Sequence, residues 1–542
     1  MTSSPPRRGL AGSEIGHNAS TPTLTSLNLD EGGAGTKRQS IDIEKRAVVA
    51  DADVGQERAR SVNEGRRTSG STYSSARSSP TLENGGTSAQ REDGEKENLL
   101  RLEGDENPLN WPKTKKWVIT IVASYCFLSE SLGASMPSGG AEAISKDLDM
   151  SKEVFSLVTT TYVLGYVFGP LIWAPLSELR GRFIVNLTST IGLGLWNVGG
   201  ALAPNTRTLL VLRFFAGLFG SAAQSNSGAT ISDMWAPRVR AWPMMTYTVS
   251  ALCGPTLAPF IGGFISTASP TSWRWIFWTL SLTSAFTLAS IMVIGHETYA
   301  PVLLARKAKK LRQERGDSTI VAPIEEAKVD LKEVLTVYVS RPLRLTVTFL
   351  PCAYTCFVMS FAYLVLFIFF EAFPVIFSGV YGFNPGESGL AFLPVAVGIV
   401  ASLPFVAYFN RYYVRKRDEK EGPAPEARLI MTAYAAPLFI LGFLWTGWTA
   451  RKDIHWIVPM LGEIPVGIGL IFFFNSLATY VVECTQRYAA SALAAASMSR
   501  SLLAAIAPLY GRQMFEWSIG WSMSILAFIS LAISPLPYFF YQ

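Results

Sequence analysis

Four ionisable side chains lie inside apolar stretches of this sequence. Glu130, Arg213, Glu371 and Glu463 each fall within a run of the length that crosses a bilayer, about 20 residues. A charged group at membrane depth is costly, so such residues are functional candidates. A carboxyl group in apolar surroundings can bind a proton near neutral pH. We therefore expect proton exchange at Glu130 or Glu463, with Arg213 adjusting the site and Glu371 as a further candidate.

A structural role for the same charges stays open. Counted along their runs at about 1.5 Å per residue, Glu130 and Arg213 fall at a similar depth, so they could form an ion pair. Glu371 lies just before Pro374, nearer the end of its run, where it could instead face water in an outer vestibule.

A short polar cluster ends the stretch at residues 165–182, GYVFGPLIWAPLSELRGR. The GxxxG pattern that ends at Gly169 lets a neighbouring helix approach closely in lipid. Glu178, Gly181 and Arg182 then belong to an acid–Arg–Gly–Arg cluster, which is more specific than a connecting loop requires. The pattern predicts the end of one membrane helix, a very short loop and the start of the next helix.

Membrane-spanning helices must position these groups. The first six apolar runs lie near 117–137, 154–174, 183–203, 208–232, 242–266 and 273–294. The second six lie near 345–373, 387–408, 427–449, 454–482, 489–510 and 518–539. The sequence therefore predicts an all-α membrane protein with twelve spans. Its two six-helix halves are residues 105–294 and 343–542, and a middle loop, 295–342, joins them.

Residues 1–104 differ in composition from the rest. Positions 1–100 contain no Trp, Phe or Cys and are rich in Ser, Thr, Gly, Arg and Glu. Such a segment buries too little apolar surface to offset its ordering entropy, so we expect a disordered cytoplasmic tail. Its strings Lys37–Ser40 and Arg66–Ser69 resemble the sites of basophilic kinases.

Lysine and arginine are concentrated on one side of the predicted membrane. They precede the first span and lie in the loops after spans 2, 4, 6 and 8, among them Lys113, Lys115, Lys116, Arg180, Arg182, Arg238, Arg240, Arg306, Lys307, Arg411, Arg415 and Lys420. Because such residues favour the cytoplasmic side, we expect both termini and the middle loop there. Residues 301–315 predict a basic amphipathic helix on the anionic inner leaflet.

Other classes of chemistry have little support. The five cysteines lie in or beside apolar runs without metal-ligand spacing. The net charge of +6 comes from residues in membrane-facing loops, so it does not indicate nucleic-acid binding. The GxxxxGKS/T pattern of nucleotide-binding loops is absent, and the three histidines accompany no nucleophile–base set. We expect no enzyme activity, cofactor, metal or nucleic-acid partner.

From about residue 105 onward, the chain resembles fungal members of the major facilitator superfamily, specifically the twelve-helix drug:proton antiporters. The matching stretches are GPLIWAPLSELRGR, RFFAGLFGSAAQSNSGATISDMWAPRVR, CGPTLAPFIGGFI, SWRWIFW, HETYAPVLLARKAKKLR and RYAASALAAASMSRSLLAAIAPLYGRQMF. The chain departs from the pattern at Glu178, where the superfamily at large has Asp, at Ala258 in place of Gly, and at His296 in place of Pro. The resemblance implies the major facilitator fold, with spans 1, 4, 7 and 10 around a central cavity.

The resemblance also implies a cytoplasmic gate. Glu178 lies on the same side as the start of span 11, and a carboxylate near a helix N-terminus is favourable by about 0.3–1 kcal/mol. We expect Glu178 to cap span 11 near residues 489–491 when the gate is shut, braced by Arg182 and Arg240. Asp233 of the span 4 pattern joins this gating group. The alternative is a basic loop with one incidental acid.

Span 5 carries a glycine and proline pattern that the resemblance links to antiporters. Gly254, Pro255, Gly262 and Gly263 loosen the helix or remove a hydrogen-bond donor, so we expect a bend that takes part in gating. Close packing of small residues is the alternative interpretation.

Aromatic and amide side chains at membrane depth are substrate-binding candidates. The rings can stack on a planar or amphiphilic ligand, and the amides can hydrogen-bond a ligand or a helix. The candidates are Gln224, Asn226, Tyr354, Phe357, Phe361, Phe474 and Asn475.

These observations predict a monomeric exporter of amphiphilic small molecules, driven by protons and placed in the plasma membrane, with an internal membrane such as the vacuolar one as the alternative. A transporter dedicated to one endogenous compound, such as a polyamine or a secondary metabolite, is a second hypothesis. A transporter-like sensor that binds its ligand without flux is a third.

Overall fold

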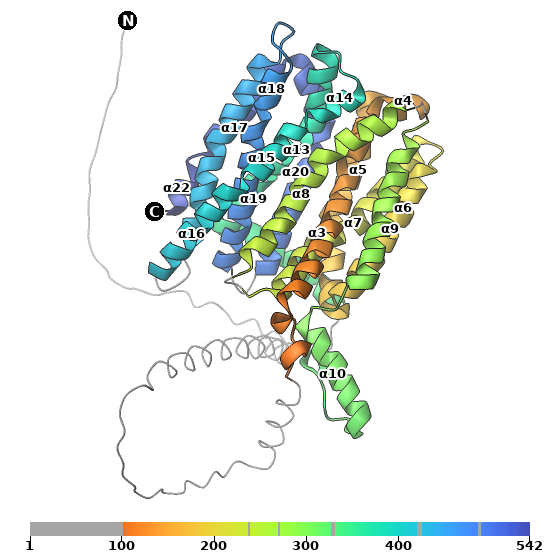
Figure 1. Ribbon diagram of the computed structural model, residues 1–542, viewed down its shortest axis with the longest axis vertical. Coiled ribbons are helices and arrows are strands. Elements are labelled where there is room, and N and C mark those ends of the chain that lie inside the picture. Colours follow the sequence, from red (N-terminus) through yellow and green to blue (C-terminus); the bar gives the residue numbers. More distant parts are fainter. Residues whose placement is uncertain are drawn as a thin grey trace, which may run out of the picture. The chain divides into compact units, whose positions relative to one another are not determined.

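The computed structural model describes residues 101–236, 239–268, 271–326, 331–419, 425–485 and 489–541. The predicted disordered tail and both kinase-like strings lie outside these residues, apart from positions 101–104. Arg238 and Lys420 also lie outside them. Within the described residues every regular element is a helix (Figure 1).

The long helices of the first half follow one another through short connections. Their bounds are α3 Lys113–Ser135, α5 Lys152–Arg180, α6 Arg182–Ala201, α7 Thr206–Met234, α8 Ala241–Thr267 and α9 Arg274–Ile294. The short elements are η1 Gly104–Glu106, η2 Pro108–Asn110, η3 Met136–Gly140 and α4 Ala141–Asp147. The middle segment holds α10 Ala300–Arg315 and α11 Pro323–Glu326.

The second half uses more and shorter helices. Its elements are α12 Leu331–Thr348, α13 Leu350–Phe373, η4 Pro374–Val380, α14 Pro385–Leu390, α15 Leu393–Ala401, α16 Leu403–Glu419, η5 Pro425–Arg428, α17 Leu429–Thr449, α18 Ile457–Leu461, α19 Glu463–Thr485, α20 Ala489–Trp517, α21 Ile519–Ile533 and α22 Leu536–Tyr541. Figure 1 shows the two halves side by side, coloured orange to green and teal to blue.

Eleven stretches of the described residues are long and apolar enough to cross a membrane. They coincide with all the predicted spans except 183–203. That run forms the 20-residue helix α6, which packs against α7 and α9. Asn186 and Asn197 are polar side chains within it. The structure thus confirms the predicted fold class, an all-α membrane protein with twelve spanning helices.

Four predicted spans of the second half are divided into shorter helices: 345–373, 387–408, 454–482 (α18 and α19) and 518–539 (α21 and α22). The run at 387–408 is three helices, α14, α15 and α16, with Pro394 and Pro404 in the first turns of the last two. Proline lacks the N–H that would continue a preceding helix, so the breaks fall where the prolines do. The predicted start of span 7 at residue 345 lies in α12, which ends at Thr348 before Pro351. Most of α12 falls in the segment predicted as a polar interruption.

The halves meet mainly where α5 packs against α20 and where α8 packs against α14 and α15. Thr160 Oγ1 on α5 donates to the carbonyl oxygen of Ala505 on α20 at 2.8 Å. A Cβ atom on Gly263 of α8 would overlap the backbone of Pro385 on α14. These contacts join the halves near one end of the bundle, which we call the Gly139 end. The opposite end, where Gly181 follows α5, is the Gly181 end.

Helix α8 holds the glycines and prolines predicted to bend span 5. It runs unbroken, although Pro259 has no N–H to donate to the carbonyl oxygen of Pro255. Ser135 Oγ of α3 donates to that oxygen at 3.0 Å and so replaces the missing bond. Cβ atoms on Gly254 and Gly262 would overlap Ser131 and Met136. These residues therefore bring α3 and η3 into close contact with α8, which supports the packing interpretation; a bend stays a prediction.

The predicted helix at 301–315 is present as α10, which extends beyond the ends of the neighbouring spanning helices (Figure 1). Its buried Ala308 packs in a cluster with Ile320 and Ala322, against which Leu304 and Leu311 also lie. The chain itself thus covers the apolar side of α10, which leaves only its basic side for the predicted contact with lipid.

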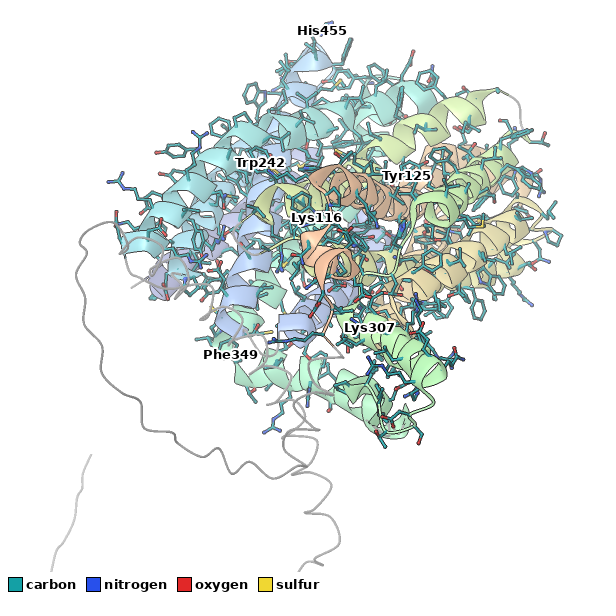
Figure 2. All side chains as sticks on the ribbon, turned by 60° about the horizontal axis from the view of Figure 1, so that its bottom comes forward. Lys116, Tyr125, Trp242, Lys307, Phe349 and His455 are labelled. Atoms are coloured by element: carbon teal, nitrogen blue, oxygen red, sulfur yellow. The ribbon has the colours of Figure 1, made fainter. Side chains whose placement is uncertain are left out.

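Figure 2 shows Lys307 on α10, close to the segment that precedes α3. Its Nζ donates to the carbonyl oxygen of Arg101 and to Glu106 Oε2, both at 2.7 Å. The hydrogen bond from Lys307 holds the pKa of Glu106 below its ordinary value. These bonds fasten residues 101–106 to the middle segment.

Glycines set the spacing between α5 and α7. A Cβ atom on Gly165 or Gly169 would overlap α7, and one on Gly217 would overlap the carbonyl oxygen of Tyr162. The GxxxG prediction is confirmed as a packing motif.

Gly217→Ala should destabilise the protein by about 1–3 kcal/mol, because the added methyl meets backbone that cannot rotate away. Thermal unfolding of the purified protein in detergent would show this as a lower Tm. Gly194→Ala is the matched control, since its Cβ would lie 3.5 Å from the nearest atom, on Ser284. Equal melting temperatures for both variants would contradict the packing argument.

Candidate functional site

Glu130 lies at the middle of the first half. Its side chain is fully buried, and no hydrogen bond of ordinary geometry reaches either carboxylate oxygen among the described residues, although the Tyr166 hydroxyl interacts with the carboxylate. The hydroxyl groups of Tyr162 and Tyr166 donate to the backbone carbonyl oxygen of Glu130 at 2.9 and 3.3 Å. Its Cγ packs on Gly220, where a Cβ would lie 2.8 Å away. Tyr166 and Gly220 are each the fifteenth of 29 residues in their helices, so Glu130 lies at mid-depth.

Arg213 does not pair with Glu130. It lies on α7 two turns from Gly220 toward the Gly139 end, about 10 Å along the axis. Its Nε donates to the carbonyl oxygen of Val158 at 3.1 Å, and its guanidinium lies 4.0 Å from the ring centre of Tyr162. The prediction of similar depths was wrong, because α3 continues through η3 and α4 beyond Glu130 before the span ends. Backbone and ring stabilise the Arg213 charge instead of the carboxylate.

Arg500 on α20 is a mid-membrane charge that the sequence analysis missed. Its Cζ atom lies 5.2 Å from the ring centre of Tyr363 and 5.6 Å from that of Phe474. Its charge interacts with Glu130 and with Tyr247 of α8. The signal was the same one that revealed Glu130, an ionisable residue inside an apolar span.

Only some of the predicted substrate residues gather near Arg500. Phe474 packs edge-on against Tyr363, with ring centres 5.9 Å apart. Gln224 Oε1 accepts a hydrogen bond of 2.7 Å from Ser497 Oγ, one turn from Arg500 on α20. These two predicted residues therefore contact the same group of helices as Arg500.

The other predicted substrate residues lie apart from this group. Asn226 donates to Asn186 Oδ1 of α6 at 3.2 Å. Phe361 packs on Phe439 of α17, and Phe357 is 54% exposed. Tyr354 is buried, and the described part of the chain gives no side-chain hydrogen bond for Asn475. Their substrate role rests on the sequence alone.

Glu371 and Glu463 lie near the Gly139 end. Ser156 Oγ of α5 donates to Glu371 Oε1 of α13 at 3.4 Å, so this carboxylate joins the two halves. Glu463 is fully buried at the start of α19 and, within the described ranges, its carboxylate has no hydrogen-bond partner. The two predicted proton candidates thus differ. Glu371 bonds to the first half, whereas Glu463 is enclosed within the second half.

At the Gly181 end, Glu297 is a residue that the sequence analysis overlooked. Its side chain is 1% exposed. Its carboxylate accepts backbone N–H bonds from Arg182 and Phe183, the first residues of α6, at 3.0 and 3.4 Å, and from Thr298 and Tyr299 at 3.0 Å. A carboxylate at a helix N-terminus satisfies free N–H groups and complements the helix dipole. Glu297 thereby fixes the start of α6.

Gly181 is required for this contact. Its φ of 98° lies in a region that side-chain-bearing residues rarely adopt. A Cβ atom there would overlap the Glu297 carboxylate. The sequence singled out Gly181 within the polar cluster. The residue that requires a glycine there is Glu297, 116 positions further along the chain.

Arg182 and Asp233 form an ion pair, with Nε and Oδ2 3.5 Å apart. Thr298 Oγ1 also donates to Asp233 Oδ2, at 3.3 Å. The Arg182 guanidinium lies 4.7 Å from the ring centre of Tyr299, whose pKa burial raises to about 12. Arg240 donates to the carbonyl oxygens of Ser232 and Trp235, and burial lowers its pKa. Four of the predicted gating residues, Gly181, Arg182, Asp233 and Arg240, therefore gather where α5 and α7 end and α6 begins, whereas those of span 5 lie along α8.

Glu178 belongs to this group too. It is half-buried, and its carboxylate interacts with the charges of Arg182 and Asp233. Within the described ranges it makes no hydrogen bond or ion pair with α20. Residues 486–488 lie outside those ranges, and the cap on span 11 stays a prediction.

The second half repeats the arrangement. Arg428, just before α17, places Nη2 3.1 Å from Glu483 Oε1 near the end of α19. Its Nη1 donates to Asn410 of α16 at 3.2 Å, and its guanidinium lies 3.3 Å from the ring centre of Tyr413. Arg182 and Asp233 have the corresponding places in the first half. The sequence analysis missed this pair because the loop has no glycine-containing motif.

Comparisons with known proteins agree with this architecture. Residues 123–508 match the family model described as Major Facilitator Superfamily. The chain is 36% identical to the "Major facilitator superfamily multidrug transporter mdrA" of Aspergillus fumigatus, over 82% of this chain and 74% of that protein. It is 33% identical to the "Major facilitator superfamily multidrug transporter FLU1" of Candida albicans, over 80% and 72%. The xylose transporter XylE from E. coli has a similar fold, with a TM-score of 0.58 at 14% identity, over 79% and 98%.

Glu297→Ala should lower the free energy of unfolding by about 1–3 kcal/mol, since it leaves buried N–H groups without an acceptor. Thermal unfolding in detergent would measure the change. Glu314→Ala serves as control, because Glu314 is 56% exposed and, within the described residues, its ion pair is with Lys310 one turn away. A loss no larger than the control's would show that Glu297 does not fix α6.

Proposed function

The chain belongs to the major facilitator superfamily of membrane transporters, and from that premise we propose that it exports amphiphilic small molecules in exchange for protons. Both named relatives are described as multidrug transporters, which supports a broad substrate range. The proposal places the protein in the plasma membrane as a monomer, with the Gly181 end in the cytoplasm because its loops are basic.

The proposal rests on the burial of the Glu130 carboxyl group at the middle of the first half. This carboxyl group is enclosed at mid-depth, and no hydrogen bond of ordinary geometry reaches it among the described residues. Such a group binds a proton more readily than it carries a bare charge, because burial penalises the ionised form. When the cavity opens to water, the same group can ionise and release the proton. A mid-depth carboxyl that alternates between two aqueous sides couples proton entry to export when the proton and the substrate occupy the site in turn.

The contacts between the halves fit alternating access. Near the Gly139 end, Glu371 bonds to Ser156 and Thr160 bonds to Ala505. Each is a single hydrogen bond, worth about 0.5–1.5 kcal/mol net. Opening this end breaks these two bonds and also separates the close backbone packing of α8 against α14. We assign Glu371 to an outer gate. Protonation of its carboxylate from the external water would weaken the hydrogen bond that it accepts from Ser156 of α5.

Efflux of a fluorescent amphiphile from energised cells should stop when a protonophore collapses the proton gradient. Efflux that continues unchanged, at constant cellular ATP, would rule out proton coupling. Cells that lack the protein give the background rate.

Glu130→Gln should abolish the pH dependence of transport in proteoliposomes, because glutamine cannot exchange a proton. We expect substrate counterflow to persist and uphill transport to fall at least tenfold, about 1.4 kcal/mol or more of coupling. Glu463→Gln tests the other enclosed carboxyl, and Glu314→Gln is the exposed control. Retained pH dependence in both Glu130→Gln and Glu463→Gln would place the proton site elsewhere.

A further inference from the structure

Arg500 is the basic side chain whose charge acts on Glu130. Arg213 lies two turns toward the Gly139 end, about as far into its span as Glu463 is into its own. With Glu130 ionised, the charges of Glu130 and Arg500 offset each other, and with Glu130 protonated the charge of Arg500 is uncompensated. The protonated state therefore favours a negatively charged group beside Arg500.

Arg500 can present its charge to a ligand. Within the described residues it has no ion pair with a carboxylate, and its buried Nε has no hydrogen-bond partner. The rings of Tyr363 and Phe474 stabilise the guanidinium through cation–π contacts, which leave its in-plane N–H groups available. A guanidinium binds a carboxylate through two parallel hydrogen bonds.

A second donor lies beside it. Gln224 is 5% exposed, and its Nε2 has no partner in the part of the chain that the structure describes. Its Oε1 is fixed by Ser497, which lies three residues before Arg500 and therefore on the same side of α20. The bond from Ser497 orients the amide so that its N–H groups stay unused. Gln224 comes from the first half and Arg500 from the second, so a ligand that bonds to both would bridge the halves.

We propose that Arg500 and Gln224 select substrates that carry an anionic group, such as a carboxylate, attached to a planar aromatic body. This inference rests on the proposed function and specifies its substrate class. The anionic group contacts Arg500 and Gln224, and the body packs on Tyr363 and Phe474. Cations such as polyamines are disfavoured at this site because Arg500 repels them.

The test uses three tritiated probes that share one ring system: 1-naphthaleneacetate, its neutral amide and 2-(1-naphthyl)ethylamine. Binding is measured on the full-length protein in nanodiscs by scintillation proximity. We expect the wild-type protein to bind the acetate at least tenfold more tightly than the amine. Arg500→Gln should weaken acetate binding tenfold to a hundredfold, change amide binding less than threefold, and leave amine binding equal or tighter. Arg500→Lys should give an intermediate loss, since lysine keeps the charge without the planar fork.

Two further variants separate charge recognition from folding. Gln224→Glu keeps the acceptor for Ser497 but replaces the donor with a carboxylate, so acetate binding should fall and amine binding should rise. Arg512→Gln is the matched control on the same helix, because Arg512 pairs with Glu516 at 2.8 Å and should not affect any probe.

Equal losses for all three probes in Arg500→Gln, with no change in preference in Gln224→Glu, would overturn the inference in favour of a structural role. Wild-type protein that prefers the amine would also overturn it and would leave proton-driven export untouched. Export that resists a protonophore would contradict the proposed function without altering the measured charge preference.

Discussion

A polar group buried in a membrane protein has no water to bond to, and this constraint explains where the chemistry of the molecule lies. Most buried polar groups have an internal partner that satisfies them. Pro255 illustrates this: its carbonyl oxygen loses the N–H of Pro259 and gains Ser135 instead. Glu297 is the strongest case, with four backbone N–H groups on one carboxylate. Several buried polar groups of the described residues keep at least one atom without a hydrogen-bond partner, among them Glu130, Gln224, Glu463 and Arg500.

The same constraint separates two kinds of charge. Near the helix ends, Arg182 with Asp233 and Arg428 with Glu483 are paired, and each pair ties a third helix of its half to a fourth. At mid-depth, the guanidinium groups of Arg213 and Arg500 lie against aromatic rings instead of carboxylates. Paired charges hold each half together as a unit, and unpaired charges at the middle remain available to protons and ligands.

The sequence predicted the fold well because its signals are local. Bilayer-length apolar runs give the spans, and GxxxG at Gly169 gives the close approach of α5 and α7. The site was predicted less well because its contacts are remote in sequence. Nothing near Gly181 indicates Glu297, and nothing near Gln224 indicates Ser497. Depth was also misjudged: a count of residues from a span boundary put Arg213 level with Glu130, whereas the extension of the first span through η3 and α4 separates them.

The anchoring of the middle segment limits how the halves can move. Glu297 fixes its first residues to α6, Lys307 ties α10 to the segment before α3, and Arg312 pairs with Glu325 at 2.7 Å. The segment from Gly295 to Glu325 thus belongs mechanically to the first half. Relative movement of the two halves therefore cannot be taken up within the stretch from Gly295 to Glu325.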